Sequence, residues 1–283
     1  MHLRIGARLF QGPGPFLMGI VNTTPDSFSD GGRFVDPAAA AEQALRLAEE
    51  GADLVDVGGE STRPGAPAVA AEEEVRRVVP VIARLRACGF ALPISVDTTK
   101  AEVARAALDA GADLVNDVQG LADPALAALV AARGVPAVIM HTRGTPADMA
   151  SRAVYGDVVE EVATELAAAL DRAEAAGVVR GRIILDPGIG FAKAARHSVA
   201  LLAAVPRLRQ LGCPILLGPS RKSFIGQLTG ALVEERLPGT LAAVVAGVLA
   251  GAELFRVHEV AAARQAALVA AAIRDAAAAG GRA

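Results

Sequence analysis

Short apolar segments that stop at a polar residue recur along the chain and alternate with Ala-rich segments of helical character. The first, Phe16 to Val21, is a continuous apolar run of the length expected for a buried strand, and it stops at Asn22. The loop from there to Gly32 holds threonines, a proline, acceptor side chains and a Gly-Gly pair, which is more chemistry than a surface turn needs. A strand that brings its last residue and a polar loop to one face is the repeating unit of a parallel barrel.

Seven more segments follow this pattern, and the sequences between them predict helices. The further strands are predicted at 53–58, 92–96, 113–118, 137–141, 183–187, 214–218 and 253–258. Helix starts are predicted at Asp36-Pro37, at Asp123-Pro124, at Ser220, and at a capping box formed by Thr99 and Glu102. Repeated strand–helix units with no linker between them predict an α/β fold, a (β/α)8 TIM barrel that occupies residues 1–283 as a single domain. Leu3 to Phe10 predicts a short N-terminal β-hairpin that closes the bottom of the barrel.

An internal repeat marks three of the predicted junctions between a helix and the next strand. Gly-Ala-Asp-Leu-Val begins at Gly51 and again at Gly111, and Gly-Ala-Glu-Leu-Phe begins at Gly251. We expect each glycine to end a helix in the left-handed conformation, which glycine adopts without steric cost.

Length, composition and charge narrow the class of protein. A chain of 283 residues is the size of one barrel, and its net charge of −3 argues against a nucleic-acid-binding face. The first residues contain no long apolar region, so we expect no signal peptide. Thr240 to Ala252 is uncharged but too short to span a bilayer, and it predicts a buried helix at a subunit contact. Cys88 and Cys213 are interpreted as reduced core thiols, which fits a cytoplasmic protein without a membrane partner.

Polar side chains gather at the carboxyl ends of the predicted strands, where a barrel has its pocket. They are Asn22, Glu60 to Arg63, Asp97, Asn116, Asp117, Met140, His141, Asp186, Ser220 to Lys222, Arg256 and His258. Singly, Asp97 could cap a helix, Asn116 could satisfy a turn and His258 could be a packed core histidine. Arg256 and His258 are two residues apart, however, so they point to the same side of one strand.

This set predicts two kinds of chemistry in one pocket. Asp97, Asn116 and Asp186 are acceptors that suit a flat nitrogen heterocycle with an amidine-like edge, which a carboxylate binds as it binds guanidinium. Lys222 would reach a carbonyl oxygen or a nitrogen of that ring.

The second half of the pocket is predicted to bind an anion. Arg63, Arg256, His258 and the loop after Asn22 suggest a diphosphate site, with the Asn22 oxygen as a ligand of Mg2+. The sequence has neither a Walker loop nor a GxGxxG motif, so ATP or dinucleotide binding is not supported.

Together these motifs resemble the dihydropteroate synthases over nearly the whole chain. The resemblance lies in Gly19 to Asn22 with Thr24 to Gly32, Gly59 to Gly65, Ser95 to Thr98, Asn116-Asp117, Met140-His141 with Arg143 to Pro146, Asp186 to Phe191, Ser220 to Ile225 and Arg256 to His258. It implies a barrel homodimer that joins p-aminobenzoate to 6-hydroxymethyl-7,8-dihydropterin diphosphate and releases diphosphate. We expect a dissociative, carbocation-like path, because aromatic amines are weak nucleophiles.

The resemblance also implies roles for single residues. The pterin would be held by Asp97, Asn116, Asp186 and Lys222, with Met140 and Phe191 lining it and Arg256 stacked on it. Diphosphate and Mg2+ would be held by Asn22, Arg63, Arg256 and His258. The p-aminobenzoate pocket would be shaped by Phe28, Thr62, Pro64 and Ser223. Asp97, Lys222 and Arg63 would carry catalysis.

Two other functions remain open from the sequence. One is a methyltransferase that binds methyltetrahydrofolate in a similar barrel, which would have no use for a diphosphate site. The other is a synthase-like subunit that binds ligands without catalysis, in which some of Asn22, Arg63 and Lys222 should be absent; all three are present.

Overall fold

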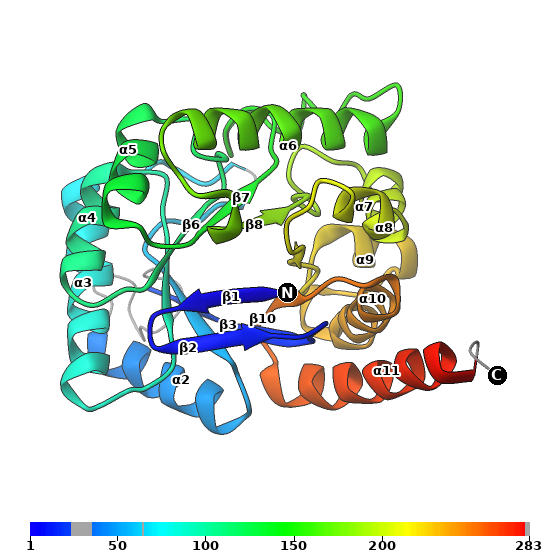
Figure 1. Cartoon of the computed structure of the whole chain (residues 1–283), viewed down its shortest axis with the longest axis horizontal. Helices are drawn as coiled ribbons and strands as arrows, with labels where there is room; N and C mark the ends of the chain where they lie inside the picture. The colour runs from blue at the N-terminus through cyan, green and yellow to red at the C-terminus, as the bar shows by residue number, and fades with distance from the viewer. Residues whose placement is uncertain (24–35, 64, 281–283) are drawn as a thin grey trace.

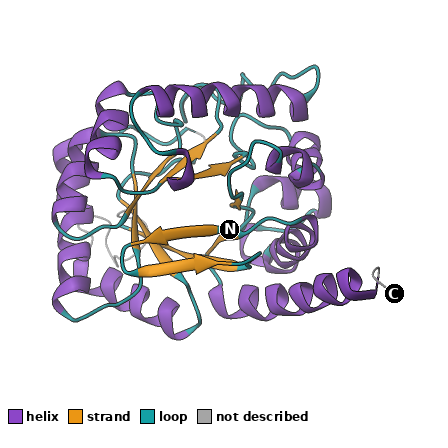
Figure 2. Cartoon of the chain, in the orientation of Figure 1, coloured by secondary structure: helices purple, strands orange, loops and turns teal. Residues whose placement is uncertain are grey.

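The computed structural model describes residues 1–23, 36–63 and 65–280, and they form the predicted barrel (Figures 1 and 2). Eight parallel strands run in the order β8-β7-β6-β5-β4-β3-β10-β9. Their bounds are β3 Phe16–Asn22, β4 Leu54–Gly58, β5 Ile94–Asp97, β6 Leu114–Asp117, β7 Ala137–Met140, β8 Ile183–Asp186, β9 Leu216–Leu217 and β10 Leu254–Val257. A parallel bridge between Leu185 and Ile215 joins β8 to the chain just before β9, so the two ends of the sheet meet.

Helices surround the sheet on the outside (Figure 2). They are α2 Pro37–Glu49, α3 Ala71–Ala87, α4 Ala101–Asp109, α5 Pro124–Arg133, α6 Val158–Ala175, α7 Ala195–Ala203, α8 Val205–Arg209, α9 Ser223–Thr229, α10 Leu237–Ala250 and α11 Val260–Gly280. Each strand therefore has one face toward the barrel interior and one toward a helix, which explains why the strand sequences are almost continuously apolar.

Two of the four predicted helix starts are confirmed and two are wrong. Asp36 and Asp123 cap α2 and α5 with their side chains. The predicted capping box does not form, because the N-cap residue of α4 is Lys100, one position after Thr99, and the hydroxyl of Thr98 accepts from the Lys100 N–H instead. Ser220 is not a cap either: α9 begins at Ser223.

The internal repeat fixes the start of three strands. Gly51, Gly111 and Gly251 have φ angles of 99°, 110° and 96°, so each ends a helix in the left-handed region as predicted. The acidic residue two positions later accepts a hydrogen bond from a backbone N–H near the start of the neighbouring strand. The pairs are Asp53 with Leu17, Asp113 with Ile94 and Glu253 with Ile215. The repeat is thus a structural device that ties adjacent strands together.

The N-terminal hairpin closes the bottom of the barrel, as predicted. Strands β1 (His2–Ile5) and β2 (Arg8–Gln11) pair antiparallel, and Figure 1 shows them lying across the middle of the ring of helices. Their buried side chains pack on inward-facing residues of the barrel strands. This cluster is Leu3, Ile5, Phe10, Met18, Leu54, Leu114, Val138, Ile184, Leu216 and Leu254.

The period of two along each strand places a polar layer above this apolar one. Two residues beyond Leu54, Leu114 and Ile184 come Asp56, Asn116 and Asp186, which share the inward face. The bottom of the barrel is therefore an apolar plug, and the upper half is free to bind a ligand.

The structure also shows the environment of the two cysteines and the character of the helices. Both cysteines are free; Cys213 is buried as predicted, but Cys88 is exposed at the end of α3, so its interpretation as a core thiol is wrong. None of the described helices combines the length and the apolar composition that a membrane-spanning segment requires.

Candidate active site

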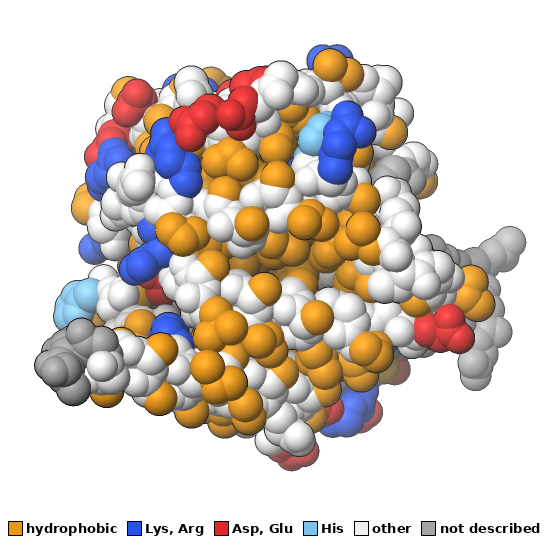
Figure 3. Space-filling view, turned by 90° about the vertical axis from the view of Figure 1, so that its right-hand side faces the viewer, with side chains coloured by type: hydrophobic (Ala, Val, Ile, Leu, Met, Phe, Trp, Pro, Cys, Tyr) orange, Lys and Arg blue, Asp and Glu red, His pale blue; other side chains and the backbone are white. Residues whose placement is uncertain are grey.

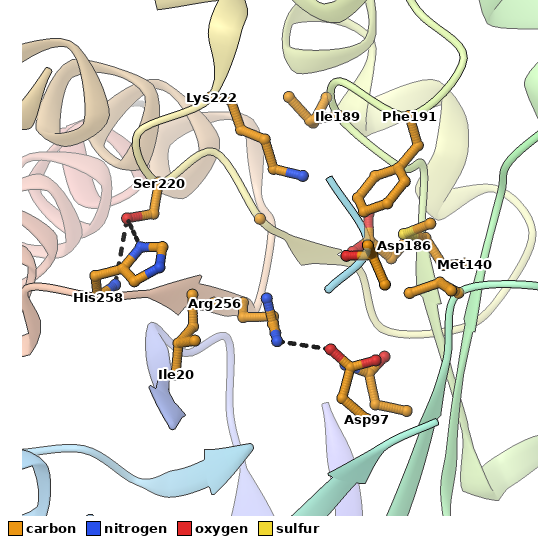
Figure 4. Close-up of a pocket in the computed structure, with 14 residues that line it drawn as sticks. Ile20, Asp97, Met140, Asp186, Ile189, Phe191, Ser220, Lys222, Arg256 and His258 are labelled. Carbon is orange, nitrogen blue, oxygen red and sulfur yellow. Dashed lines mark hydrogen bonds and ion pairs between the residues drawn. The ribbon is translucent and has the colours of Figure 1, made fainter. Parts of the chain in front are cut away.

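A pocket opens at the carboxyl ends of the strands (Figure 4). Nine of the predicted site residues line it: Thr62, Asp97, Asn116, Met140, Asp186, Phe191, Lys222, Arg256 and His258. Ile20, Val118, Ile189, Gly218 and Ser220 complete the lining. The pocket therefore combines a wall of apolar side chains with charged groups of both signs, as a site for a flat polar ring requires.

Arg256 on β10 is the centre of a buried ion-pair network. Its Nε donates to Oδ2 of Asp56 at 2.6 Å, and its Nη2 donates to Oδ2 of Asp97 at 2.7 Å. Asn116 donates from Nδ2 to the same oxygen of Asp56 at 3.0 Å. Asp97 is therefore paired with Arg256 inside the pocket and does not cap a helix. Burial raises its pKa to about 7, with the nearby Asp56 charge adding to the effect and Arg256 opposing it.

Asp56 is the member of this network that sequence reasoning missed. It lies within β4 and is completely buried, whereas the predicted polar residues stand at strand ends. Its second oxygen, Oδ1, has no hydrogen-bond partner within the described part of the chain. A carboxylate at an inward-facing position of an otherwise apolar strand, two residues after Leu54, was the available signal.

Asp186 at the end of β8 is positioned by its own loop. Its Oδ1 accepts from the Gly188 N–H at 2.7 Å, and no described group donates to its other oxygen. Burial raises the pKa of Asp186, opposed by the Gly188 N–H and by the positive charges of Lys222 and Lys193. An acidic group with one oxygen already held can present the other to a ligand N–H.

Lys222 stands opposite Asp186 on a strained turn before α9 (Figure 4). Arg221, just before it, has a φ of 55°, which is rare for a residue with a side chain, and the hydroxyl of Thr240 accepts from its N–H. This conformation directs Lys222 Nζ over the Phe191 ring, 3.9 Å from its centre. Burial lowers the pKa of Lys222 to about 8, against the effect of Asp186.

His258 and Ser220 form a polar pair at the other end of the pocket. Ser220 Oγ lies 2.9 Å from His258 Nδ1 and accepts from the His258 N–H. Burial lowers the pKa of His258 to about 3, and positive charges including those of Arg256, Arg221 and Arg63 lower it further. Such a concentration of positive charge around a neutral imidazole favours an anionic ligand.

Three predicted residues lie outside this lining, and two cannot be placed. Asn22 is half-buried at the end of β3, Arg63 is exposed on the loop after β4, and Ser223 is the exposed first residue of α9. Phe28 and Pro64 lie outside the described residues. Of the residues assigned to p-aminobenzoate, the pocket thus brings in Thr62 alone among those described.

A magnesium ion would have to be held mainly by its substrate. The described residues contain no group of three His, Cys, Asp or Glu side chains that could form a protein-only metal site. Mg2+ prefers octahedral oxygen ligands, keeps several waters, and is commonly bound through one or two protein groups plus phosphate. The single amide oxygen of Asn22 at the rim fits that pattern.

Comparison with known proteins agrees with this geometry. The family model described as "Pterin binding enzyme" matches residues 18–258. A dihydropteroate synthase of Synechocystis sp. is 47% identical over 261 residues, which cover 91% of this chain and 90% of the relative. This chain belongs to the dihydropteroate synthase family. A member from Mycobacterium leprae is 50% identical over 252 residues, covering 86% of this chain and 88% of the relative.

Solved structures of family members have the same fold. The Xanthomonas albilineans synthase with 4-aminobenzoic acid superimposes with a TM-score of 0.90 at 51% identity, covering 96% of this chain and 98% of the other. The same enzyme in complex with 7,8-dihydropteroate gives a TM-score of 0.87 at 48% identity, covering 97% and 99%. The (β/α)8 fold predicted from the strand pattern is confirmed by the family as well as by the strand order.

Proposed function

We propose that this chain is a transferase that condenses 6-hydroxymethyl-7,8-dihydropterin diphosphate with p-aminobenzoate, giving 7,8-dihydropteroate and diphosphate. The observation that carries the proposal is the convergence of Asp97, Asn116, Asp186 and Lys222 on one pocket with an apolar wall. Membership of the synthase family supports the same reaction.

The pterin ring would lie between the apolar wall and the charged layer. Asp186 would accept from the N–H and NH2 edge with its second oxygen, and Asn116 would bind a neighbouring ring atom. Met140 and Phe191 would cover one face and Arg256 the other, and Lys222 would donate to the ring carbonyl or a ring nitrogen. This arrangement orients the methylene carbon toward the cationic end of the pocket.

Bond breaking would precede attack by the amine. The bond between the methylene carbon and the diphosphate oxygen breaks, its electron pair leaves with diphosphate, and the remaining cation is delocalised into the dihydropterin. Arg63, Arg256 and His258 would stabilise the leaving group, and Asp97 would face the developing cation. A magnesium ion on Asn22 would supply further positive charge at the diphosphate. The amine then forms the new C–N bond and gives up a proton.

One assay tests the reaction and separates the alternatives. Purified protein should release diphosphate only when the pterin diphosphate and p-aminobenzoate are both present. A methyltransferase would bind a pterin but release no diphosphate, and a non-catalytic subunit would bind both ligands without turnover. Release with the pterin diphosphate alone, at an unchanged rate, would contradict the proposed condensation.

Replacement of Asn22 by alanine should act on the metal and spare the pterin. We expect Asn22→Ala to need more magnesium for half-maximal turnover, while its affinity for 6-hydroxymethylpterin stays within about threefold of wild type. Asn116, the only other asparagine, is the matched control: Asn116→Ala should weaken the pterin and leave the magnesium requirement unchanged. Magnesium titrations that coincide for wild type and Asn22→Ala would place the metal elsewhere.

The pH dependence of kcat/KM should be a narrow bell. Asp97, with a pKa of about 7, must lose its proton to face the cation, so activity should rise through that value. Lys222, with a pKa of about 8, must keep its proton, so activity should fall above it. Rates measured from about pH 5 to about pH 10 should show both limbs, and Asp97→Asn should lose the acidic limb from its residual activity. A flat wild-type profile across neutral pH would contradict these roles.

A homodimer is proposed because a broad apolar surface lies over the C-terminal helices. Figure 3 shows hydrophobic side chains gathered on the face that α9, α10 and α11 occupy in Figure 1. The exposed apolar residues include Leu228, Leu249, Leu268, Val269 and Ile273. We propose that a second copy of this chain binds to this surface. Such a dimer would place the segment from Thr240 to Ala252 at the subunit contact, where the sequence predicts it.

Sedimentation should therefore give a dimer for the wild-type protein. Val269→Glu would place a charge inside the contact and should yield a folded monomer. Val179→Glu makes the same change at an exposed apolar residue outside α9, α10 and α11, so it is the matched control and should stay dimeric. A monomeric wild type at micromolar concentration would contradict the proposal.

The cytoplasm is the compartment that we propose. Both cysteines are free thiols, and they lie on α3's end and before β9 without a partner in the described structure. Thiols of this kind fit a reducing compartment.

A further inference from the structure

Lys193 is a buried lysine just outside the lining of the active-site pocket. It belongs to the loop between β8 and α7, two residues after Phe191, and only 8% of its surface is exposed. Its Nζ donates to the carbonyl oxygen of Phe191 at 2.8 Å and contacts His141 Nδ1 at 2.9 Å. The His141 carbonyl oxygen lies at 3.4 Å. Lys193 therefore connects the loop that carries Phe191 to the end of β7.

His141 continues this connection to the outer helix α6. Because a lysine ammonium can only donate, Nδ1 of His141 must carry the lone pair and Nε2 the proton. Nε2 lies 2.9 Å from Oε2 of Glu165, which Arg143 also binds. Burial lowers the pKa of His141 to about 4, with the Lys193 charge lowering it further, so the ring is neutral near neutral pH. Lys193 thus donates in two directions, to the Phe191 carbonyl and to His141 Nδ1, and His141 in turn donates from Nε2 to Glu165.

The backbone around Phe191 needs such an external anchor. Gly190 has a φ of 80° and Ala192 a φ of 48°, so Phe191 stands between two residues in the left-handed region. Alanine is rarely found there, because its Cβ crowds the backbone. Nearby, a Cβ on Gly188 would lie 2.0 Å from the His141 carbonyl oxygen, which shows how closely the loop passes β7. A donor fixed to the Phe191 carbonyl holds this strained segment in place.

We propose that Lys193 is a positioning residue for the active site, which holds the Phe191 ring against Lys222 by binding the Phe191 carbonyl and the end of β7. The inference rests on the proposed function, in which Phe191 forms a wall of the pterin site. Lys193 itself does not line the pocket; its effect passes through the backbone of Phe191, whose ring carries the Lys222 contact at 3.9 Å. His141 and Glu165 orient Lys193 from the opposite side.

The contacts do not depend on one charge state of Lys193. Burial lowers the pKa of Lys193 to about 7, opposed mainly by Asp186. A neutral amine keeps two N–H groups, which suffice for the two shortest contacts, to the Phe191 carbonyl and to His141 Nδ1. No ion pair of Lys193 occurs among the residues described, which distinguishes it from Lys100, whose ammonium binds Glu60 and Glu74.

A double-mutant cycle tests the inference by calorimetric binding of 6-hydroxymethylpterin. Lys193→Met should weaken binding about tenfold, and Phe191→Ala should weaken it as well. If Lys193 acts through Phe191, the double variant should bind no more weakly than Phe191→Ala alone. Additive losses in the cycle would overturn the positioning role. Lys100→Met is the matched control, and its affinity should stay within about threefold of wild type.

Two further results keep the inference separate from the proposed function and from folding. If wild type does not bind the pterin, the proposed function fails; if wild type and Lys193→Met bind it equally, the positioning role alone fails. Nitrogen-15 spectra of the histidines test the proposed hydrogen bonds in the wild-type protein, so this result does not depend on whether a variant folds. They should show His141 neutral, with the proton on Nε2; a proton on Nδ1 would contradict donation by Lys193.

Discussion

Replacement of Asp186 by asparagine is expected to reduce the affinity for 6-hydroxymethylpterin by about a hundredfold or more. In the proposed complex the free oxygen of Asp186 accepts from the N–H and NH2 edge of the ring, while Oδ1 stays bound to the Gly188 N–H. An asparagine that keeps its oxygen toward Gly188 turns an NH2 group toward the ring, so two donors face each other. Loss of a buried, charge-assisted pair costs on the order of 3 kcal/mol.

The measurement is calorimetric titration of wild type and variant at the same pH. Asp171→Asn is the matched control, because Asp171 is an exposed residue of α6 and the same chemical change there should leave affinity unchanged. A melting temperature close to wild type would show that Asp186→Asn is folded. An affinity within about threefold of wild type would remove Asp186 from the pterin site.

The barrel and most of its pocket could be predicted because both follow from local pattern. Each strand is a short apolar run that ends at a polar residue, and parallel strands bring those ends to one face. Asp97, Asn116, Asp186, Lys222, Arg256 and His258 were found in this way, and all of them line the pocket. The spacing of Arg256 and His258 correctly placed both side chains in one pocket, since side chains alternate along an extended chain.

What the sequence did not show depends on contacts between distant segments. Asp56 binds Arg256 across 200 positions of the chain, and Lys193 meets His141 across 52. Asp56 is recognisable in the sequence as a charge in an apolar segment, and Lys193 as a charge after a glycine-rich one. The sequence does not show that their partners are Arg256 and His141. Ser220 illustrates the reverse error: a serine near a helix start suggests a cap, yet its hydroxyl is committed to His258.

Replacement of Arg256 by methionine should have the largest combined effect on stability and activity. The variant leaves the fully buried carboxylate of Asp56, and that of Asp97, without their shared cation. Removal of one partner from a buried ion pair lowers the free energy of unfolding by about 3–5 kcal/mol. Turnover should fall at least about a hundredfold, because the variant loses one of the charges proposed to stabilise the leaving diphosphate. Urea unfolding and the diphosphate-release assay measure the two effects.

The double variant Asp56→Asn/Arg256→Met separates the two effects. It removes one orphaned charge while an amide oxygen remains for Asn116, so it should recover part of the stability and none of the activity. Recovery of activity in the double variant would show that Arg256 serves only to neutralise Asp56. If Arg256→Met unfolded at the same urea concentration as wild type, the network would not be the buried charge cluster described above.

The stability loss of Arg256→Met should also depend on pH, and the sign follows from Asp97. The pKa of Asp97 is raised from its ordinary value of 3.8 to about 7, so the folded protein binds this proton more tightly than the unfolded chain does. The contribution of Asp97 to the free energy of unfolding is therefore fully present at low pH and is lost as the pH rises through that interval. Arg256 opposes this rise; without it the pKa of Asp97 goes higher, and the loss continues to higher pH. The difference in unfolding free energy between wild type and variant should therefore be smaller at about pH 6 than at about pH 9. A difference that does not change with pH would mean that Asp97 does not depend on Arg256 for its charge.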